Sequence, residues 1–233
     1  MGREGGASRG PYTSLNLSYW VGDNSRSVDV SWQRARRLMP RKVRFAQLRQ
    51  VHGKAIHTIG PRLDADPRPE ADGLVTTMAG VVLCIFTADC VPVLLADNQH
   101  GVIGALHAGW RGTLSGIAGA GVRAMVRQGA RANRIRALLG PSIGPCCYEV
   151  DDDLARRFER AHTHVHPSDR SGKAYLDLRG IVADQLAGAG LEREGIKILG
   201  PCTRCEADRY FSRRAAGGSI TGLQLSFIGR FVA

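Results

Sequence analysis

The sequence predicts an α+β fold, in which strands and helices mix without a regular strand–helix–strand alternation. Apolar runs of strand length, such as 81–87 and 91–96, follow one another with only turn residues between them. A doubly wound parallel sheet would instead place a helix between successive strands. No internal repeat or low-complexity linker divides the 233 residues, so we expect a single domain over residues 1–233.

The first half of the chain is predicted to form one helix and then four strands. The helix has Ser27 as its N-cap and stops at Pro40, because apolar residues recur at helical spacing between them. Runs of β-favouring residues between turn residues predict strands over 43–51, 81–87, 91–96 and 101–107. His52 then follows the first strand, Cys90 lies between two strands, and His107 ends the last one.

The second half is predicted to mix helices and strands irregularly. Apolar residues recur at helical spacing from Thr113 onward, and further helices are expected over 152–161 and 178–187. Further strands are expected over 135–139, 196–199 and 223–228. The chain lacks the G-x-G-x-x-G pattern, so no dinucleotide site is predicted.

The chain is strongly basic. Lys and Arg number 32 against 21 Asp and Glu, which gives a net charge of +11 and a pI of about 10.0. Such a charge suits an anionic ligand such as phosphate, and nucleic-acid-binding proteins share it. The densest basic run, over 34–49, is interpreted as a solvated helix face and edge strand, since no nucleic-acid-binding module accompanies it. A nucleic-acid partner is therefore not expected.

Two segments bear on where the protein is located in the cell. Residues 1–10 are polar and glycine-rich and lack the apolar core of a signal peptide. The longest apolar stretch, 80–96, is interrupted by Asp89 and Pro92, so it predicts two buried strands and no membrane span. We expect a cytoplasmic protein, without membrane contact, whose cysteines are reduced.

Three short motifs contain the residue types of an open metal site. They are Gln50–Gly53, Ala88–Val93 and His107–Gly112, and their candidate ligands are His52, Cys90 and His107. Two imidazoles and one thiolate suit Zn²⁺, and three protein ligands leave a fourth position for water or substrate. The spacing fits no compact metal motif, so histidines and a cysteine that are merely packed or exposed are the alternative.

The three motifs and two further segments, Ala71–Thr76 and Gly140–Val150, resemble the YfiH family. This family is also called the laccase-domain or polyphenol-oxidase-like family of purine nucleoside phosphorylases. The similarity runs nearly end to end, from Gly5–Ser8 to Phe211–Arg214. The resemblance implies mixed β-sheets sandwiched together and flanked by helices. It also implies that the zinc ligands are His52, Cys90 and His107.

The resemblance further implies an activity. It implies cleavage of purine nucleosides by phosphate, with adenosine as a main substrate, inosine, guanosine and methylthioadenosine as others, and adenosine deamination at the same site. The first alternative is polyphenol oxidation with Cu²⁺. A multicopper oxidase, however, needs more histidines for its copper cluster than the seven histidines of this chain can supply. A second alternative, also from the resemblance, is a hydrolase that edits peptidoglycan precursors.

Several residues of these motifs are candidates for supporting roles. Arg111 stands between glycines and is a candidate for binding phosphate, with a structural salt bridge as the alternative. Asp72 is interpreted as a turn residue, with support of the metal site as its alternative. The resemblance implies substrate contacts for Asn16, Gln50 and Cys147.

Two other clusters are expected to have no role in the site. His162, His164 and His166 follow a charged helix, which favours a solvated loop over a metal site. Cys202 and Cys205 form a lone C-x-x-C, and a zinc knuckle would require a second pair, so Cys205 is interpreted as incidental.

Overall fold

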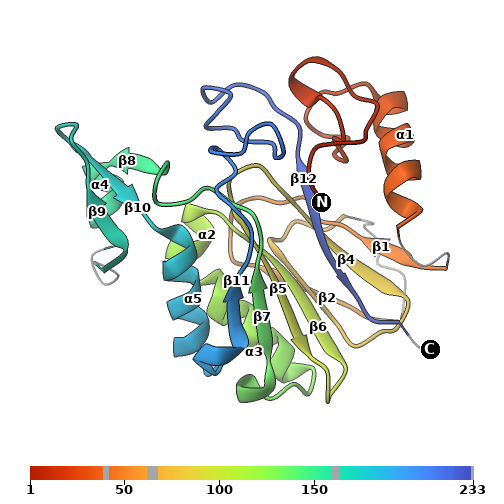
Figure 1. Cartoon of the computed structure of the whole chain (residues 1–233). Helices are drawn as coiled ribbons and strands as arrows, with labels where there is room; N and C mark the ends of the chain where they lie inside the picture. The colour runs from red at the N-terminus through yellow and green to blue at the C-terminus, as the bar shows by residue number, and fades with distance from the viewer. Residues whose placement is uncertain (39–41, 62–67, 159–162, 232–233) are drawn as a thin grey trace.

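Two β-sheets stacked face to face form the centre of the molecule, and helices cover both outer faces (Figure 1). The computed structural model describes residues 1–38, 42–61, 68–158 and 163–231. The larger sheet has the strand order β11 (Ile196–Ile198), β7 (Arg136–Leu139), β5 (Val91–Asp97), β6 (Val102–Ala108), β3 (Gly73–Thr76) and β2 (Ile56–Ile59). The smaller sheet has the order β1 (Arg44–Ala46), β4 (Val81–Thr87) and β12 (Gln224–Gly229). The predicted α+β class is confirmed.

The helices divide between the two outer faces. Helix α1 (Ser25–Arg36) packs on the smaller sheet. The larger sheet is covered by α2 (Trp110–Leu114), α3 (Ile117–Arg127) and α5 (Leu178–Gly188). A small third sheet, made of β8 (Glu149–Asp151), β10 (Lys173–Leu176) and β9 (Val165–Pro167), projects to one side with α4 (Asp152–Arg156) (Figure 1). Single turns of 3₁₀ helix lie at Gly10–Tyr12, Ala132–Arg134 and Arg193–Gly195.

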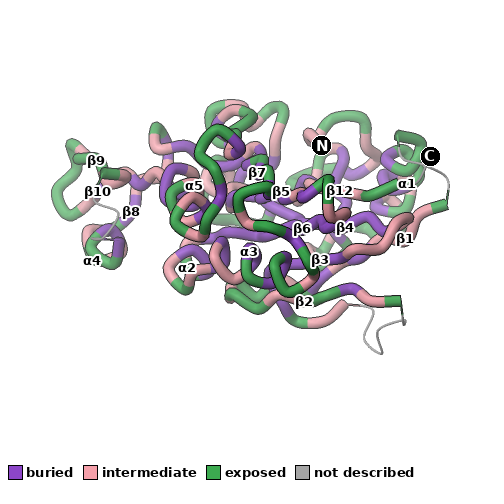
Figure 2. The backbone as a smooth tube through the Cα atoms, turned by 90° about the horizontal axis from the view of Figure 1, so that it is seen from below, coloured by how far each residue is buried: buried purple, intermediate pink, exposed green. Residues whose placement is uncertain are grey.

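Strand β4 is buried at every position because both of its faces are covered. Successive side chains of a strand point to opposite faces. Val82, Cys84 and Phe86 accordingly pack toward α1, while the intervening residues pack against the larger sheet. Figure 2 shows the result: buried backbone runs along the central strands, and exposed backbone lies on the outer loops and helices.

Strand pairing in the larger sheet brings the three metal-site motifs to one end of the molecule. β5 and β6 are antiparallel with Pro92 opposite His107, so Cys90 follows just beyond the end of that pairing. β3 and β6 are antiparallel with Gly73 opposite Leu106, and the His107 N–H donates to the carbonyl of Asp72 at 2.7 Å.

Several boundaries differ from the sequence predictions for local physical reasons. The N-cap of α1 is Asn24, whose side chain accepts from the Ser27 N–H, so Ser27 lies inside the helix. The strand expected over 43–51 is confined to β1, because Gln50 turns its side chain onto the main chain of β4. The helix expected from Thr113 is divided by Gly116, which has a left-handed φ of 83° and ends α2 before α3 begins.

The segments around the third sheet also differ from prediction. α4 covers only the start of the predicted 152–161 helix, and the end of that range lies outside the described residues. His162 is likewise outside them, whereas His166 belongs to β9 and not to a loop. His164 bonds through its Nε2 to Asp184 at 2.8 Å, so a carboxylate of α5 holds its ring.

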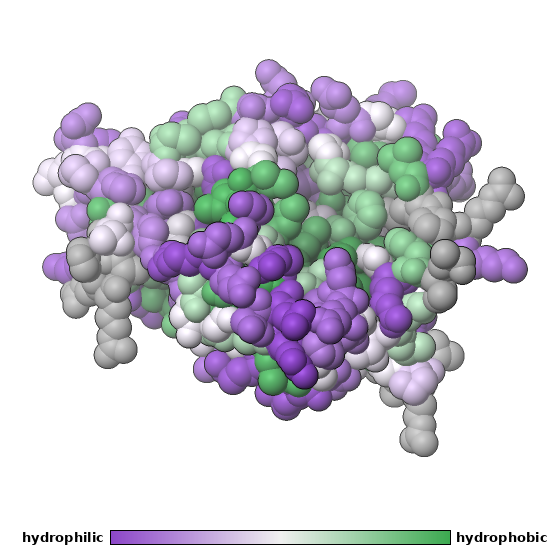
Figure 3. Space-filling model, turned by 60° about the horizontal axis from the view of Figure 1, so that its bottom comes forward, coloured by the Kyte–Doolittle hydropathy of each residue, from purple (hydrophilic) through white to green (hydrophobic). Residues whose placement is uncertain are grey.

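Away from the metal-site end, the surface carries an apolar groove. A groove of about 390 Å³ is lined largely by apolar residues of β5, β7 and β12. Figure 3 shows hydrophobic side chains gathered in a hollow that hydrophilic side chains border. Among the described residues, no helix has the length and apolar character that crossing a membrane requires.

Candidate functional site

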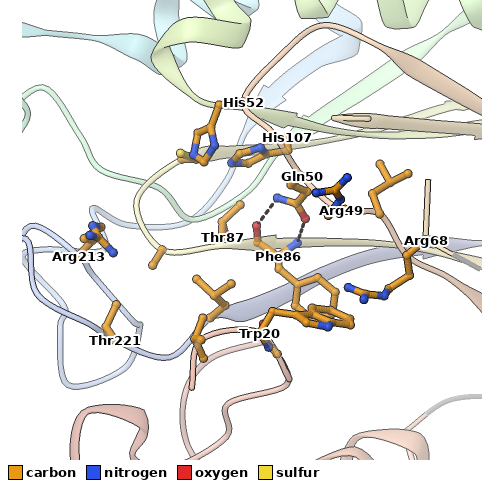
Figure 4. A pocket seen from close by; sticks show the side chains of 16 residues that line it. Trp20, Arg49, Gln50, His52, Arg68, Phe86, Thr87, His107, Arg213 and Thr221 are labelled. Carbon is orange, nitrogen blue, oxygen red and sulfur yellow. Dashed lines mark hydrogen bonds between the residues drawn. The ribbon is translucent and has the colours of Figure 1, made fainter. Parts of the chain in front are cut away.

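His52, Cys90 and His107 converge at one point although they come from separate parts of the chain. Their ligand atoms all lie within 4.8 Å of one another. His52 is in the loop between β1 and β2, Cys90 directly precedes β5, and His107 lies near the end of β6. Their rings and thiol face the same cleft (Figure 4).

Asp72 fixes the orientation of His107. The Nδ1 of His107 lies 2.8 Å from Oδ1 of Asp72, and both side chains are buried. A carboxylate accepts a hydrogen bond there, so Nδ1 carries the proton and Nε2 is left to face the cleft. Burial alone would raise the pKa of Asp72, but the hydrogen bonds from His107, Gly53 and His52 lower it below the ordinary value. This carboxylate therefore stays ionised beside the imidazole.

The same carboxylate builds the loop that presents His52. Oδ1 of Asp72 accepts from the His52 N–H at 2.9 Å, and Oδ2 accepts from the N–H groups of Gly53 at 2.6 Å and Val51 at 3.3 Å. His52 is held with a φ of 61°, a left-handed conformation that non-glycine residues seldom adopt. Asp72 is thus a support of the site, the alternative given to it by the sequence.

Cys90 is held from the opposite side by its neighbour Asp89. Asp89 also has a left-handed φ, of 86°. Its Oδ1 accepts from the Thr203 hydroxyl at 2.6 Å, and its Oδ2 accepts from the Arg214 N–H at 2.7 Å. Asp89 therefore anchors the C-terminal loop 202–214 next to Cys90.

Cys90 and His107 hold opposite charges. Burial alone would raise the pKa of Cys90, but the charges of His107 and His52 and their hydrogen bonds outweigh it and lower that pKa to about 6. Burial would lower the pKa of His107, yet the Cys90 thiolate and Asp72 raise it to about 9. Without a metal, these pKa values favour a Cys90 thiolate beside a His107 imidazolium near neutral pH, with His107 as the base that accepts the thiol proton.

The residues present fit a transition-metal ion with an open position. Two imidazole nitrogens and a thiolate are a donor set used by zinc and, with an added weak axial ligand, by copper. The backbone leaves room for this set: a Cβ at Gly109 would lie 3.1 Å from Cys90 Sγ and 3.1 Å from His52 Cδ2. Only glycine at position 109 leaves the three ligands undisturbed.

A cavity of about 460 Å³ opens from the three ligands. Figure 4 shows His52 and His107 at one end, Trp20 and Phe86 at the other, and Thr87 between them. Trp20 and Phe86 contact edge to face, with ring centroids 6.2 Å apart. The cavity therefore has a polar, metal-competent end and an aromatic end.

Two polar groups in this cavity are available to a ligand. The Thr87 hydroxyl is buried and lacks a hydrogen-bond partner within the described part of the chain. Arg213 lines the cavity, and its guanidinium makes no ion pair with a described residue. A ligand that carries hydroxyl and anionic groups would satisfy both.

The residues predicted to contact substrate are distributed differently. Gln50 lines the cavity, but its amide bonds both ways to the main chain of Phe86, at 2.8 and 2.9 Å (Figure 4). Asn16 is fully buried and organises the loop that carries Trp20, with bonds to Ser18 and Asp23. Both act on elements that line the cavity, and Asn16 itself is not among the lining residues.

Arg111 and Cys147 lie outside the cavity lining. The guanidinium of Arg111 stacks on Trp110, with its Cζ 4.2 Å from the ring centroid. Cys147 is buried in a separate group of thiols.

Sequence reasoning missed the aromatic end of the cavity and Arg213. Trp20 carried no motif signal, and Phe86 is indistinguishable in sequence from the rest of an apolar strand. Arg213 stands in a segment that resembles the family, and that position was the one signal that pointed to it.

The comparisons with known proteins agree with this geometry. The sequence pattern that defines the multi-copper polyphenol oxidoreductase laccase family matches residues 1–230. The chain belongs to this family. Its resemblance to YfiH-type proteins is thereby confirmed, and family membership makes it an enzyme.

Relatives of this family member span nearly the whole chain. It is 42% identical to a purine nucleoside phosphorylase of Deinococcus radiodurans, over 97% of this chain and 86% of the relative. It is 38% identical to adenosine deaminase RL5 of an unknown prokaryotic organism, over 90% of this chain and 84% of the relative.

Solved structures show the same fold. The crystal structure of YlmD from Geobacillus stearothermophilus is 35% identical, with a TM-score of 0.88 over 100% of this chain and 90% of that one. The hypothetical protein YfiH of Bacillus licheniformis is 31% identical, with a TM-score of 0.90 over 98% of this chain and 90% of that one. The expected sandwich of mixed sheets flanked by helices is confirmed.

Proposed function

We propose that this enzyme is a zinc-dependent purine nucleoside phosphorylase that also deaminates adenosine. The observation that carries the proposal is the convergence of His52, Cys90 and His107 at one end of a cavity with an aromatic opposite end. Relatives named as a phosphorylase and as a deaminase support both reactions. Adenosine is the expected main substrate, with inosine, guanosine and methylthioadenosine as further substrates.

The cavity residues divide the work between metal and substrate. His52, Cys90 and His107 would hold the zinc ion, and Asp72 keeps the two histidines in place. A zinc ion held by these three protein ligands would keep an open position and would lower the pKa of water bound there. The aromatic faces of Trp20 and Phe86 suit a purine ring, and the Thr87 hydroxyl suits a ribose or base hydrogen bond.

Phosphorolysis also requires a group that holds phosphate close to the sugar. A guanidinium is suited to this because its planar fork matches phosphate oxygens. Arg111 is the candidate that the sequence offers. Arg49, Arg68 and Arg213 line the cavity, but Arg49 pairs with Glu70 and Arg68 lies over the ring of Trp20, so Arg213 is the candidate in the lining. We propose Arg213 as the residue that contacts phosphate in the cavity, and Arg111 as a second cation that attracts it toward the site.

Copper-dependent oxidation is the second candidate, because the family description names it. A multicopper oxidase requires a histidine-rich cluster beside its His₂Cys site. Within the described residues, the groups able to hold a metal are the His52, Cys90 and His107 site and one set of four cysteines. His100 is bound instead to Asp97, at 2.8 Å, in the β5–β6 turn. Neither donor set among the described residues is a histidine-rich cluster, so we favour nucleoside chemistry over multicopper oxidation.

A product analysis tests the proposal. Metal-quantified protein is incubated with adenosine, with and without phosphate, in air and under anaerobic conditions. We expect adenine and ribose 1-phosphate only when phosphate is present, inosine in either case, and no dependence on oxygen. Absence of any nucleoside product, together with oxygen-dependent oxidation of a diphenol, would replace the proposal with the oxidase function.

A further inference from the structure

We propose a second metal site, a closed tetrathiolate zinc site formed by Cys146, Cys147, Cys202 and Cys205. The sequence offered a lone C-x-x-C without a partner pair. The structure supplies that pair, because the adjacent Cys146 and Cys147 lie against it. The four Sγ atoms all lie within 4.8 Å of one another. This site shares no residue with the His52, Cys90 and His107 site.

The distances between sulfur atoms match a tetrahedral metal site. Zinc–sulfur bonds of about 2.3 Å at tetrahedral angles separate neighbouring sulfur atoms by roughly 3.8 Å. Cys205 Sγ lies 3.7 Å from Cys146 Sγ and 3.4 Å from Cys147 Sγ. Both separations are far longer than the S–S bond of about 2.05 Å. The other sulfur pairs lie within 4.8 Å, so a zinc ion among the four thiols would require the sulfur atoms to approach one another by at most about 1 Å.

Packing alone explains two of the four cysteines. Cys147 and Cys202 are buried beside Ile143, as free cysteines in cores commonly are. Cys146 and Cys205 are exposed, yet they turn their sulfur atoms toward each other and toward the buried pair. An exposed thiol gains nothing by packing there. A ligand shared by all four sulfur atoms explains why the exposed side chains point inward.

The surroundings suit four thiolates. The Gly144 N–H donates to Cys202 Sγ at 3.2 Å, and the backbone N–H groups of Arg204 and Cys205 also bond to this sulfur. The guanidinium of Arg204 bonds to the thiol of Cys147. Four thiolates around Zn²⁺ carry two net negative charges, and N–H donors and a cation stabilise such charge. The four cysteines would fill all four coordination positions without a neighbouring carboxylate, and a zinc site closed in this way is structural.

The four cysteines join two loops that hold Cys90. One loop, 140–148, donates the Ile143 N–H to the Asp89 carbonyl at 2.9 Å. The other loop, 202–214, donates the Thr203 hydroxyl to the Asp89 side chain at 2.6 Å. The loops also meet through the short bridge between Ser142 and Cys202 and through a hydrogen bond from the Arg214 guanidinium to the Cys147 carbonyl. A metal at this junction would fix both loops, and through Asp89 it would keep the backbone of Cys90 in place.

Zinc counting in matched cysteine variants tests this site. Protein is purified under reducing conditions without chelator, and zinc per chain is measured for the parent, Cys205→Ser, Cys146→Ser, Cys90→Ala and the control Cys84→Ala. We expect two zinc ions in the parent and in the control, and one in each other variant. After cobalt substitution, the thiolate-to-cobalt charge-transfer band should be strong in Cys90→Ala and largely lost in Cys205→Ser.

The outcomes separate this proposal from the proposed function. Loss of one zinc in Cys90→Ala alone, with parental zinc content and cobalt spectra in Cys205→Ser and Cys146→Ser, would overturn the tetrathiolate site and leave the nucleoside site standing. Alkylation of freshly purified, denatured protein gives a second readout. We expect six modified thiols after removal of metal, whereas a disulfide between Cys205 and Cys146 or Cys147 would contradict the proposal.

Discussion

Asp72 is the residue on which the candidate metal centre depends most. Its two oxygens accept from the ring of His107 and from the backbone N–H groups of the His52 loop. One buried carboxylate thus sets the tautomer of one imidazole and the backbone of the other. An asparagine at this position would keep the shape of the side chain. Its NH₂ group, however, would face N–H groups that also donate, so hydrogen bonds would be lost. The ligands would remain, and their orientation would be lost.

We therefore predict that Asp72→Asn weakens zinc binding by roughly 10- to 100-fold, the usual effect of removing a partner of a ligand histidine. Competition with a chromophoric chelator measures this. Asp97→Asn is the matched control, because Asp97 is equally buried but lies at the β5–β6 turn. Parental zinc affinity in Asp72→Asn would remove this carboxylate from the account.

Gly109 gives a steric test of the same centre. A methyl group there would lie 3.1 Å from both Cys90 Sγ and His52 Cδ2, so Gly109→Ala must push two ligands apart. We predict at least a tenfold loss of zinc affinity and of adenosine turnover. Gly188→Ala is the control, since its Cβ would meet open space in helix α5. Equal behaviour of the two variants would contradict the proposed crowding.

The β5–β6 hairpin positions His107, and one carboxylate closes its turn. Asp97 is buried, and it accepts from the N–H groups of Gln99, His100 and Arg131 and from the His100 ring. Burial alone would raise the pKa of Asp97, but these backbone and side-chain hydrogen bonds lower it below the ordinary value. A lowered pKa stabilises the fold above the unfolded-state pKa, and that stabilisation disappears as pH falls through the folded-state value.

Asp97→Asn should therefore lower the free energy of unfolding by on the order of 2 kcal/mol at pH 7, since charge-assisted bonds to buried donors are lost. The difference from the parent should stay constant down to about pH 4, the ordinary pKa of an aspartate, and shrink below it. Urea unfolding of both proteins across this range measures it. A difference that persists undiminished at pH 3 would mean that the Asp97 charge does not matter.

A helix or strand could be predicted from the sequence where its own residues determine it, and could not where contacts with distant segments determine it. β4 was predicted with both ends correct because six consecutive apolar residues followed by Thr87 are typical of a strand covered on both faces. β3 was not predicted, because its four residues are ordered by pairing with β2 and β6. Ser27 was predicted as the cap of α1 and Asn24 caps it instead, because both residue types are good caps and only the structure shows which one bonds.

The site shows the same division between local and long-range causes. His52, Cys90 and His107 were identified from motifs, and no spacing rule could show that they meet. Cys205 was interpreted as incidental because Cys202 and Cys205 form a lone C-x-x-C, and contacts between the 140–148 and 202–214 loops bring Cys146 and Cys147 against that pair.

The cleft exists because the two sheets are stacked. One wall comes from β4 of the smaller sheet and the loop of Trp20 beside it, and the other comes from β6 and the start of β5 in the larger sheet. The C-terminal segment adds Arg213 at the rim. Ligands, aromatic wall and cation thus come from distant parts of the sequence, and the fold as a whole makes the cavity.

Kinetic measurements can distinguish the roles of Arg111 and Arg213 in phosphate binding. We predict that Arg213→Gln raises the KM for phosphate at least tenfold while changing the KM for adenosine far less, because its guanidinium faces the cavity. Arg111→Gln, which removes a stacked cation outside the lining, should affect phosphate less. A larger phosphate effect from Arg111→Gln would return the phosphate-binding role to the residue that the sequence indicated.

The central claim is that His52, Cys90 and His107 hold the zinc ion that performs the nucleoside chemistry. The most direct measurement compares zinc content and adenosine products of the parent and Cys90→Ala, with thermal unfolding as the check on folding. We predict that Cys90→Ala stays folded, carries one zinc ion fewer than the parent, and forms neither inosine nor adenine. A folded variant that lacks that zinc ion and still converts adenosine at the parental rate would contradict the claim.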